Sequence, residues 1–236
     1  PDGVQAEASR VPPEAADGLD APAPARVTWR LRAIGGRELL RDRAATLDLL
    51  ALRALQASMP EPALPTDFKN RTDGEDLVPE VLSLVRQRVV PGIVPGQRPL
   101  ATRPLVDVLR SGWGTDWEQA LLLTRYLRQL KLDALPVAVR PRHLGDADPA
   151  APVGYQSAVV RVRVGGTTTW LAPACQLCGP GELPPELGGA MALSRELTEL
   201  RPSVPGRFEA VQRADGTATI TLEGPPALAL RRWLRQ

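Results

Sequence analysis

The stretch Arg110-Ser-Gly-Trp-Gly-Thr-Asp-Trp-Glu-Gln-Ala-Leu-Leu-Leu-Thr-Arg-Tyr-Leu127 decides the fold of this chain. Thr115 and Glu118 have the spacing of a capping box, so the helix is predicted to begin at this threonine. Most of the apolar residues that follow fall on one helix face, which predicts a central, buried helix. These residues are Trp117, Ala120, Leu121, Leu123, Tyr126, Leu127 and Leu130.

Upstream of this helix, the sequence predicts three segments. Residues 1–25 hold Pro12, Pro13, Pro22 and Pro24 among Ala, Gly, Asp and Glu, and we expect a flexible Pro/Ala-rich arm because so little apolar area cannot offset chain ordering. Residues 26–75 are expected to form a tether, with a strand over 27–31 and a helix over 44–57. A further amphipathic helix is predicted over 79–90.

Downstream of the central helix, the pattern predicts antiparallel strands. A strand is expected over 135–140, and Gly165-Gly166 between two alternating arms predicts a β-hairpin, because adjacent glycines adopt the positive φ of a tight turn. Asp215-Gly216 predicts a second hairpin in the same way. A short closing helix is expected over 227–234, with Leu230, Trp233 and Leu234 packing inward.

Composition excludes several classes of function. The 29 basic and 27 acidic residues of the 236-residue chain leave a net charge of +2, so we expect no nucleic-acid partner. No apolar stretch approaches the ~18 residues of a membrane-spanning helix, and we expect no membrane insertion. No metal-ligand cluster, phosphate loop or nucleotide fingerprint occurs, so neither metal nor cofactor is expected. The chain begins at Pro1, and we expect it to be part of a larger chain or complex.

The order of these segments resembles the transglutaminase-like superfamily, whose fold is related to papain-like cysteine proteases. The resemblance covers about residues 76–200. It rests on Gly114, Ala120-Leu-Leu-Leu, Leu132-Asp-Ala-Leu-Pro-Val-Ala-Val-Arg, Ala158-Val-Val-Arg-Val-Arg-Val, Trp170-Leu-Ala-Pro, Gly181-Glu-Leu-Pro and Gly189-Ala-Met-Ala-Leu.

The resemblance implies an α+β fold in which the central helix packs on an antiparallel sheet. Residues 201–236 would then follow as a C-terminal β-hairpin and short helix. The similarity is to bacterial extracytoplasmic members of the superfamily, which implies a location in the periplasm or at the cell surface.

Members of that superfamily use a cysteine four residues before the helix alanine, a histidine that opens the hairpin and an aspartate after the Trp-Leu of its second arm. The corresponding positions here are Asp116, Ser157 and Ala172, so all three catalytic identities are absent. With Gly165-Gly166 as the turn, Ser157 lies opposite Ala174 and diagonal to Ala172. The two hairpin positions are therefore predicted to lie close together.

The chemistry of these substitutions argues against catalysis. A helix N-terminus stabilises a thiolate, an imidazole moves the proton and a carboxylate orients the imidazole. The carboxylate of Asp116 is a poor nucleophile toward amides and would repel the developing oxyanion. We therefore expect a catalytically inactive domain that serves as a protein- or peptide-interaction or scaffold module in a larger assembly.

Four aromatic residues are candidates for lining a ligand groove beside these positions, namely Trp113, Trp117, Tyr155 and Trp170. For Trp117 and Trp170, packing in the core is the alternative.

The remaining reactive residues are two cysteines and one histidine. Cys175 and Cys178 form a C-x-x-C pair, which could be half of a zinc site or a redox motif. A local disulfide, or two unreactive thiols, fits the predicted loop better. The alternative function, an active cysteine-dependent amide hydrolase or acyl transferase with a displaced nucleophile, would need one of these thiols and His143. A third interpretation is a purely architectural domain whose groove binds nothing.

Overall fold

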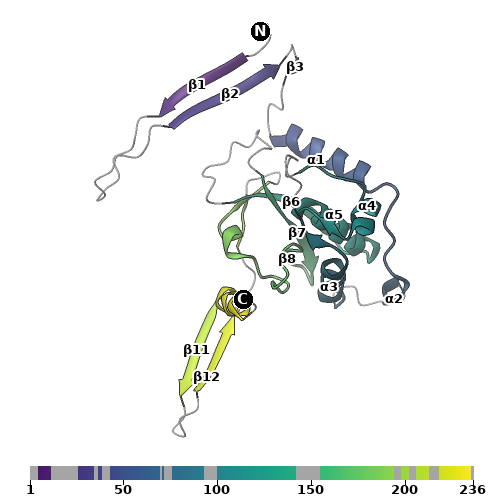
Figure 1. Cartoon of the computed structure of the whole chain (residues 1–236), viewed down its shortest axis with the longest axis vertical. Coiled ribbons are helices and arrows are strands. Elements are labelled where there is room, and N and C mark those ends of the chain that lie inside the picture. Colours follow the sequence, from purple (N-terminus) through teal and green to yellow (C-terminus); the bar gives the residue numbers. More distant parts are fainter. Residues whose placement is uncertain are drawn as a thin grey trace, which may run out of the picture.

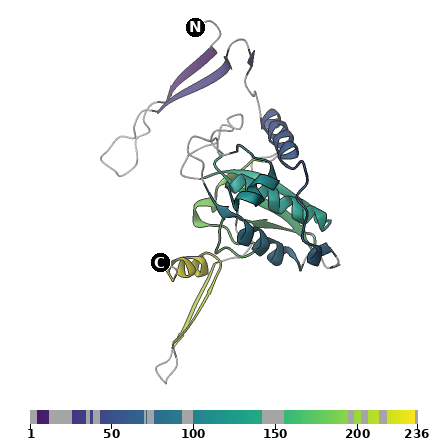
Figure 2. The same ribbon diagram turned by 45° about the vertical axis from the view of Figure 1, so that its right-hand side comes forward.

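The computed structural model describes residues 5–11, 26–34, 37–38, 43–69, 71, 76–92, 100–141, 155–193, 198–201, 206–212 and 218–234. Figures 1 and 2 show a central body of helices and sheet, with a β-sheet at the N-terminal side and a hairpin with a helix at the C-terminal side. The helices are α1 (Arg43–Ala57), α2 (Thr66–Lys69), α3 (Val78–Arg88), α4 (Leu105–Ser111), α5 (Asp116–Gln129) and α6 (Pro225–Trp233), with a 3₁₀ turn, η3 (Pro185–Leu187).

The strands form four sheets. One sheet has the order β1 (Gln5–Val11), β2 (Arg26–Ile34), β3 (Arg37–Glu38), and the central sheet has the order β10 (Thr198–Glu199), β9 (Met191–Ala192), β6 (Ala134–Arg140), β7 (Ser157–Val164), β8 (Thr167–Leu171). β11 (Arg207–Gln212) pairs with β12 (Ala218–Glu223), and β4 (Val90–Pro91) pairs in parallel with β5 (Trp113–Gly114). The described chain is therefore a mixed α+β fold.

The central helix α5 begins where the sequence predicts. The backbone N–H of Glu118 donates to Thr115 Oγ1 at 3.2 Å, and the N–H of Thr115 donates to Glu118 Oε2 at 3.0 Å. These are the two bonds of the capping box, which satisfy N–H groups that a helix N-terminus leaves without partners. The prediction of a buried helix starting at this threonine is confirmed.

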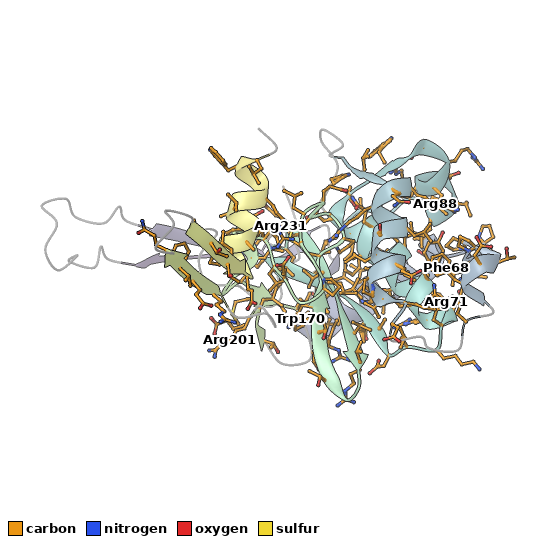
Figure 3. The ribbon with its side chains drawn as sticks, turned by 90° about the horizontal axis from the view of Figure 1, so that it is seen from below. Phe68, Arg71, Arg88, Trp170, Arg201 and Arg231 are labelled. Atoms are coloured by element: carbon orange, nitrogen blue, oxygen red, sulfur yellow. A yellow bond between two sulfur atoms is a disulfide. The ribbon has the colours of Figure 1, made fainter. Side chains whose placement is uncertain are left out.

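The central sheet is antiparallel and separates two apolar clusters. Ala134 and Ala138 of β6 and Val160 of β7 face the cluster that contains α3 and α5. Val139 and Val159 face the opposite cluster, which also holds Leu183, Leu187 and Leu200. Because successive strand residues point to opposite faces, burial on both sides explains why β6 and β7 are rich in valine and alanine. Figure 3 shows the side chains between α3 and the sheet, with Trp170 of β8 labelled.

Both predicted hairpins are present as paired strands. In β7–β8, Val164 lies opposite Thr167, as the glycine pair predicts, and Gly165 and Gly166 adopt φ values of 56° and 79°. β11 and β12 pair in register from Arg207↔Glu223 onward, while the predicted Asp215-Gly216 turn lies outside the described residues.

Two expectations about the ends of the chain are wrong. Residues 5–11 of the predicted flexible arm form β1, because strand pairing with β2 uses backbone hydrogen bonds that apolar composition does not measure. Leu230 and Trp233 of α6, and Leu234 directly after it, are 42%, 68% and 66% exposed instead of packing inward. Among the side chains of this helix that the structure describes, Leu228 is fully buried, so Leu230 and Trp233 lie on a face turned away from the core. Among the described helices, none has the length and apolar content to cross a membrane.

Candidate functional site

The three positions inferred from the superfamily resemblance lie on one pocket. Asp116, Ser157 and Ala172 all line a pocket of about 330 Å³. Its remaining walls come from the loop after β8, including Cys175, and from the region of η3, including Glu186. A volume of this size is at the lower end of the range of pockets that bind small molecules or side chains.

Three elements of the fold place these residues. Asp116 is the first residue of α5, Ser157 is the first residue of β7, and Ala172 directly follows β8. Continuing the observed register of the hairpin puts Ser157 opposite Ala174, one diagonal step from Ala172. Ser157 lies near enough to Asp116 for its hydroxyl to act as a hydrogen-bond donor that lowers the pKa of this carboxyl.

The pocket is acidic. Burial raises the pKa of Asp116, while the hydrogen bonds from Ser157 and from its own backbone N–H act in the opposite direction. The nearby negative charge of Glu186 raises the pKa of Asp116 further. These two carboxyl groups are the charged side chains among the described residues that line the pocket.

A buried ion pair fixes the N-terminus of α5. Arg103 Nε and Nη2 donate to the two carboxylate oxygens of Glu118, each at 2.9 Å, and the Glu118 side chain is 1% exposed. The backbone N–H of Arg103 adds a third bond to this carboxylate at 2.9 Å. Arg103 Nη2 also donates to the carbonyl of Trp113 at 2.8 Å, and the guanidinium stacks 3.7 Å from the Trp113 ring. The turn before Asp116 is therefore held by the contacts of Arg103 with both Trp113 and Glu118.

Glycines permit the tight approach of this turn. Gly112 ends α4 in the left-handed conformation with φ of 70°. A Cβ at Gly114 would lie 3.0 Å from Val108 Cγ1 and 3.1 Å from Val89 Cγ1, closer than side chains normally pack. The glycine-rich spacing that the sequence shows is thus required for α5 to begin against α4 and β4.

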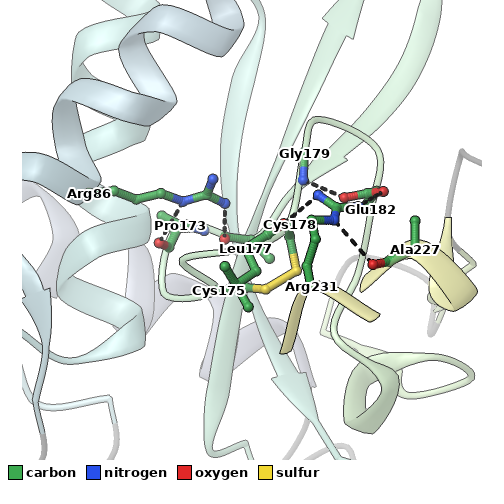
Figure 4. The surroundings of a disulfide bond; sticks show 10 residues. Arg86, Pro173, Cys175, Leu177, Cys178, Gly179, Glu182, Ala227 and Arg231 are labelled. Atoms are coloured by element: carbon green, nitrogen blue, oxygen red, sulfur yellow. Dashed lines mark hydrogen bonds and ion pairs between the residues drawn. A yellow bond between two sulfur atoms is a disulfide. The ribbon is translucent and has the colours of Figure 1, made fainter. Parts of the chain in front are cut away.

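The wall after β8 is held by two arginines and a disulfide (Figure 4). Arg86 of α3 donates to the carbonyls of Ala172 and Pro173 at 2.9 and 3.2 Å, and burial lowers the pKa of Arg86 to about 10. Arg231 of α6 donates to the carbonyl of Leu177 at 2.7 Å and pairs with Glu182 at 2.6 Å. The loop is therefore tied to α3 on one side and to α6 on the other.

The two cysteines are joined. Cys175 and Cys178 form a disulfide within this loop, with Cα atoms 5.4 Å apart. Cys175 lines the pocket and Cys178 is buried, but neither is a free thiol in this state. His143 lies outside the described residues, and no group of three or more His, Cys, Asp or Glu side chains among the described ones is arranged to hold a metal ion.

The four aromatic residues that the sequence suggested as groove residues do not line this pocket. None of Trp113, Trp117, Tyr155 and Trp170 lines the pocket. Trp117 and Tyr155 are 3% and 0% exposed in the main core, because the same helical face that carries the leucines carries Trp117. Trp113 is covered by Arg103, and Trp170 packs against the second apolar cluster.

Glu186 is a functional candidate that the sequence reasoning missed. It contributes the second carboxyl group of the pocket from η3, about 70 residues after Asp116 in the chain. Its only sequence signal is its place just after the Gly181-Glu-Leu-Pro segment, which marks a loop and carries no chemical pattern. The ion pair of Arg103 with Glu118 was also missed, because nothing in a proline-flanked loop arginine indicates its partner.

Comparisons with known proteins support the fold. No protein-family model matches the chain, and no curated protein matches it. A crystal structure from Parabacteroides distasonis ATCC 8503, described as a "putative protease", matches with a TM-score of 0.50 and 18% sequence identity. The match covers 85% of this chain and 42% of that one, so this chain spans less than half of the bacterial protein. At this identity the likeness concerns the fold alone.

We predict that Glu118→Gln lowers the free energy of unfolding by about 3 kcal/mol, because it leaves the Arg103 guanidinium without its buried counter-charge. Urea unfolding followed by circular dichroism measures the change. Asp107→Asn is the matched control, since it removes an ion pair with Arg110 whose side chains are 45% and 79% exposed. The control should change stability by less than about 0.5 kcal/mol. Equal effects of the two variants would contradict the role given to Glu118.

We predict that Asp116→Asn gains stability relative to the native protein as the pH rises from 4 to 7. A carboxyl whose folded pKa is raised binds its proton more tightly in the folded state, so ionisation costs folding free energy as the pH rises past its ordinary pKa. Asparagine has no proton to lose and so removes that cost. Unfolding measured at several pH values gives the difference between the two proteins. A difference that moves in the opposite direction would mean that the pKa is lowered.

Proposed function

We propose that residues 76–200 form a transglutaminase-like core that has lost catalysis and serves as a protein- or peptide-interaction module. The observation that carries this proposal is the convergence of Asp116, Ser157 and Ala172 on one pocket. These three positions, the first and last of which are 56 apart in the sequence, meet where the superfamily resemblance places nucleophile, base and orienting acid. The resemblance and the pocket thus support the same assignment from independent directions.

The chemistry of the pocket supports inactivity. Amide cleavage or transfer needs a nucleophile, a group that moves the proton and donors for the oxyanion. Asp116 supplies negative charge where the oxyanion would develop, the Ser157 hydroxyl acts on that carboxyl as a hydrogen-bond donor, and Ala172 has no polar side-chain atom. The displaced-nucleophile alternative would need a free thiol, whereas Cys175 and Cys178 are paired in the structure.

The pocket's walls support a binding role. Most of its lining is alanine, proline and leucine, with the polar groups of Asp116, Ser157, Gln176 and Glu186 set among them. Apolar walls with a few polar groups are typical of sites that accept a side chain or small ligand. The wall after β8 is also fixed by Arg86 and Arg231, so a ligand would not have to order it.

We propose that the module works in a bacterial extracytoplasmic or surface assembly. The disulfide between Cys175 and Cys178 supports this location, because disulfides persist in oxidising compartments and are rare in the cytosol. Apart from the disulfide, this location rests on the superfamily resemblance.

Inactivity is tested with the oxidised protein and with protein reduced by a phosphine. We expect neither form to hydrolyse glutamine or peptide amides above the buffer rate, because the described lining residues include no histidine that could activate a thiol freed by reduction. The comparison is the triple variant Asp116→Cys, Ser157→His, Ala172→Asp, whose introduced thiol should react with iodoacetamide faster than a thiol in an unfolded peptide. Amidase activity that appears on reduction and disappears after alkylation of Cys175 or Cys178 would establish the displaced-nucleophile enzyme instead.

Binding is tested with an array of random-sequence peptides. We expect the native protein to retain a subset of them and Ala174→Trp, which fills the pocket, to lose that subset. Thr168→Trp is the control, because Thr168 is exposed on the same hairpin and is not a pocket residue. Circular dichroism establishes that both variants are folded. If the filled-pocket variant retains the same peptides as the native protein, the pocket is not a binding site and the architectural interpretation holds.

A further inference from the structure

We infer that a second surface of the molecule, on α1, binds a protein partner through a segment that carries an acidic side chain among apolar ones. This surface combines a cleft of about 480 Å³ with a row of exposed apolar side chains. The described residues that line the cleft are all different from those at the Asp116 pocket. Figure 2 shows α1 at the outer side of the central body, so the inference concerns a surface separate from the proposed binding pocket.

The cleft lies between α1 and the segment that leads into α4. Its described lining residues are Arg53, Gln56, Ala57, Ala101, Thr102 and Pro104. Arg53 is the charged side chain among them, and no ion pair or hydrogen bond joins it to another described side chain. A half-buried guanidinium without a counter-charge attracts a carboxylate, whose two oxygens match its paired N–H donors.

The uncharged polar groups of the cleft add further donors. Gln56 contributes a side-chain amide from α1. The Thr102 hydroxyl donates to the carbonyl of Leu100 at 3.4 Å, which is long for a hydrogen bond from a hydroxyl. This hydroxyl therefore loses little by turning to a ligand oxygen. The described lining residues include no carboxyl group that would repel an acidic ligand.

Both walls of the cleft are held by contacts behind it. On the α1 side, Ser58 Oγ accepts a hydrogen bond from Arg125 Nε of α5 at 2.8 Å. On the other side, the backbone N–H and the guanidinium of Arg103 are bonded to the buried carboxylate of Glu118. A ligand would therefore not have to order either wall on binding.

A row of exposed apolar side chains runs beside the cleft. Leu52 and Leu55 are each 53% exposed, and Met59, which follows the end of α1, is 69% exposed. Their three- and four-residue spacing places them along one side of the helix. Gln56 lies one helical turn after Leu52 and also lines the cleft, so the row and the cleft are continuous.

These two features together select one kind of occupant. A free phosphate ion would use the cleft and leave the apolar row exposed, and a wholly apolar segment would leave Arg53 without a counter-charge. A segment with a carboxylate and neighbouring apolar side chains uses both. Asp48 lies one turn before Leu52 on α1, and its exposed carboxylate directs the acidic group of the partner toward Arg53.

The test uses acetyl-Leu-Glu-Leu amide, the same peptide with glutamine for glutamate, the same peptide with glycines for the leucines, and inorganic phosphate. Backbone amide NMR shifts of residues 52–57 and 101–103 report binding during titration. We expect the leucine–glutamate peptide to saturate these shifts and the glutamine peptide to bind about tenfold more weakly, as expected for loss of a charged hydrogen-bonding partner. The glycine peptide should also bind more weakly, because it has no apolar side chain to bury on α1.

Variants assign the binding to the cleft and to the row. Arg53→Gln should weaken the leucine–glutamate peptide about tenfold and leave the glutamine peptide unchanged. Leu55→Ser should weaken both leucine peptides by the same factor, and its exposure keeps this variant folded if Arg53→Gln is destabilised. Arg163→Gln is the control, because Arg163 is exposed on β7 outside the cleft and should have no effect.

Equal binding of the glutamate and glutamine peptides, or no effect of Arg53→Gln, would overturn the inference. Phosphate that saturates the same shifts more tightly than the peptide would make the cleft a small-anion site. A dimer in light scattering that Leu55→Ser dissociates would assign the row to a second copy of the chain, and both of these results also overturn the inference. The peptide array depends on Ala174→Trp in the other pocket, so it decides the proposed function separately.

Discussion

The buried pairing of Arg103 with Glu118 is the constraint on which the pocket depends. One carboxylate closes the capping box with Thr115, accepts two bonds from the guanidinium and accepts a third from the Arg103 backbone. A charge with 1% side-chain exposure is costly to bury unless all its acceptor positions are used, and here the bonds reach it from the loop before α4 and from the N-terminus of α5. The start of α5, and with it Asp116, is therefore fixed by groups that are not themselves in the pocket.

Because the placement of the pocket residues comes from elsewhere, their chemistry can change without loss of the fold. Asp116 sits at a helix N-terminus, where a negative side chain is favoured by the unpaired N–H groups, so a carboxylate is tolerated there although burial opposes its ionisation. Ser157 sits at the open end of a hairpin whose register is set by Gly165-Gly166, several residues away. The framework thus places Asp116 and Ser157 without using their own side chains, so the proposed exchange of catalysis for binding would need no change in the backbone.

Local sequence patterns were sufficient to predict the structural features that depend on residues near each other in the chain. The capping box of Thr115 with Glu118 and the register of Val164 with Thr167 follow from spacing alone. The hairpin register was enough to predict that Ser157 and Ala172 lie close together. Features that depend on distant partners were not predictable in this way. The pairing of Arg103 with Glu118 and the approach of Glu186 to Asp116 arise only after folding, and nothing in the periodicity of α6 shows that Leu228 rather than Trp233 is buried.

The same distinction explains why the aromatic residues were poor guides to the site. An aromatic residue beside a glycine turn is equally suited to a groove and to a core, and burial of Trp117 and Tyr155 was decided by the sheet that covers α5. The side chains at this part of the pocket wall are small: Ala158, Ala172 and Ala174 leave space that larger side chains would fill. The wall that borders this space is tied by Arg231 to α6, so the C-terminal segment helps to keep the pocket open although it contributes no lining residue. The pocket is thus a product of small residues at its surface and of long-range arginine bonds behind it.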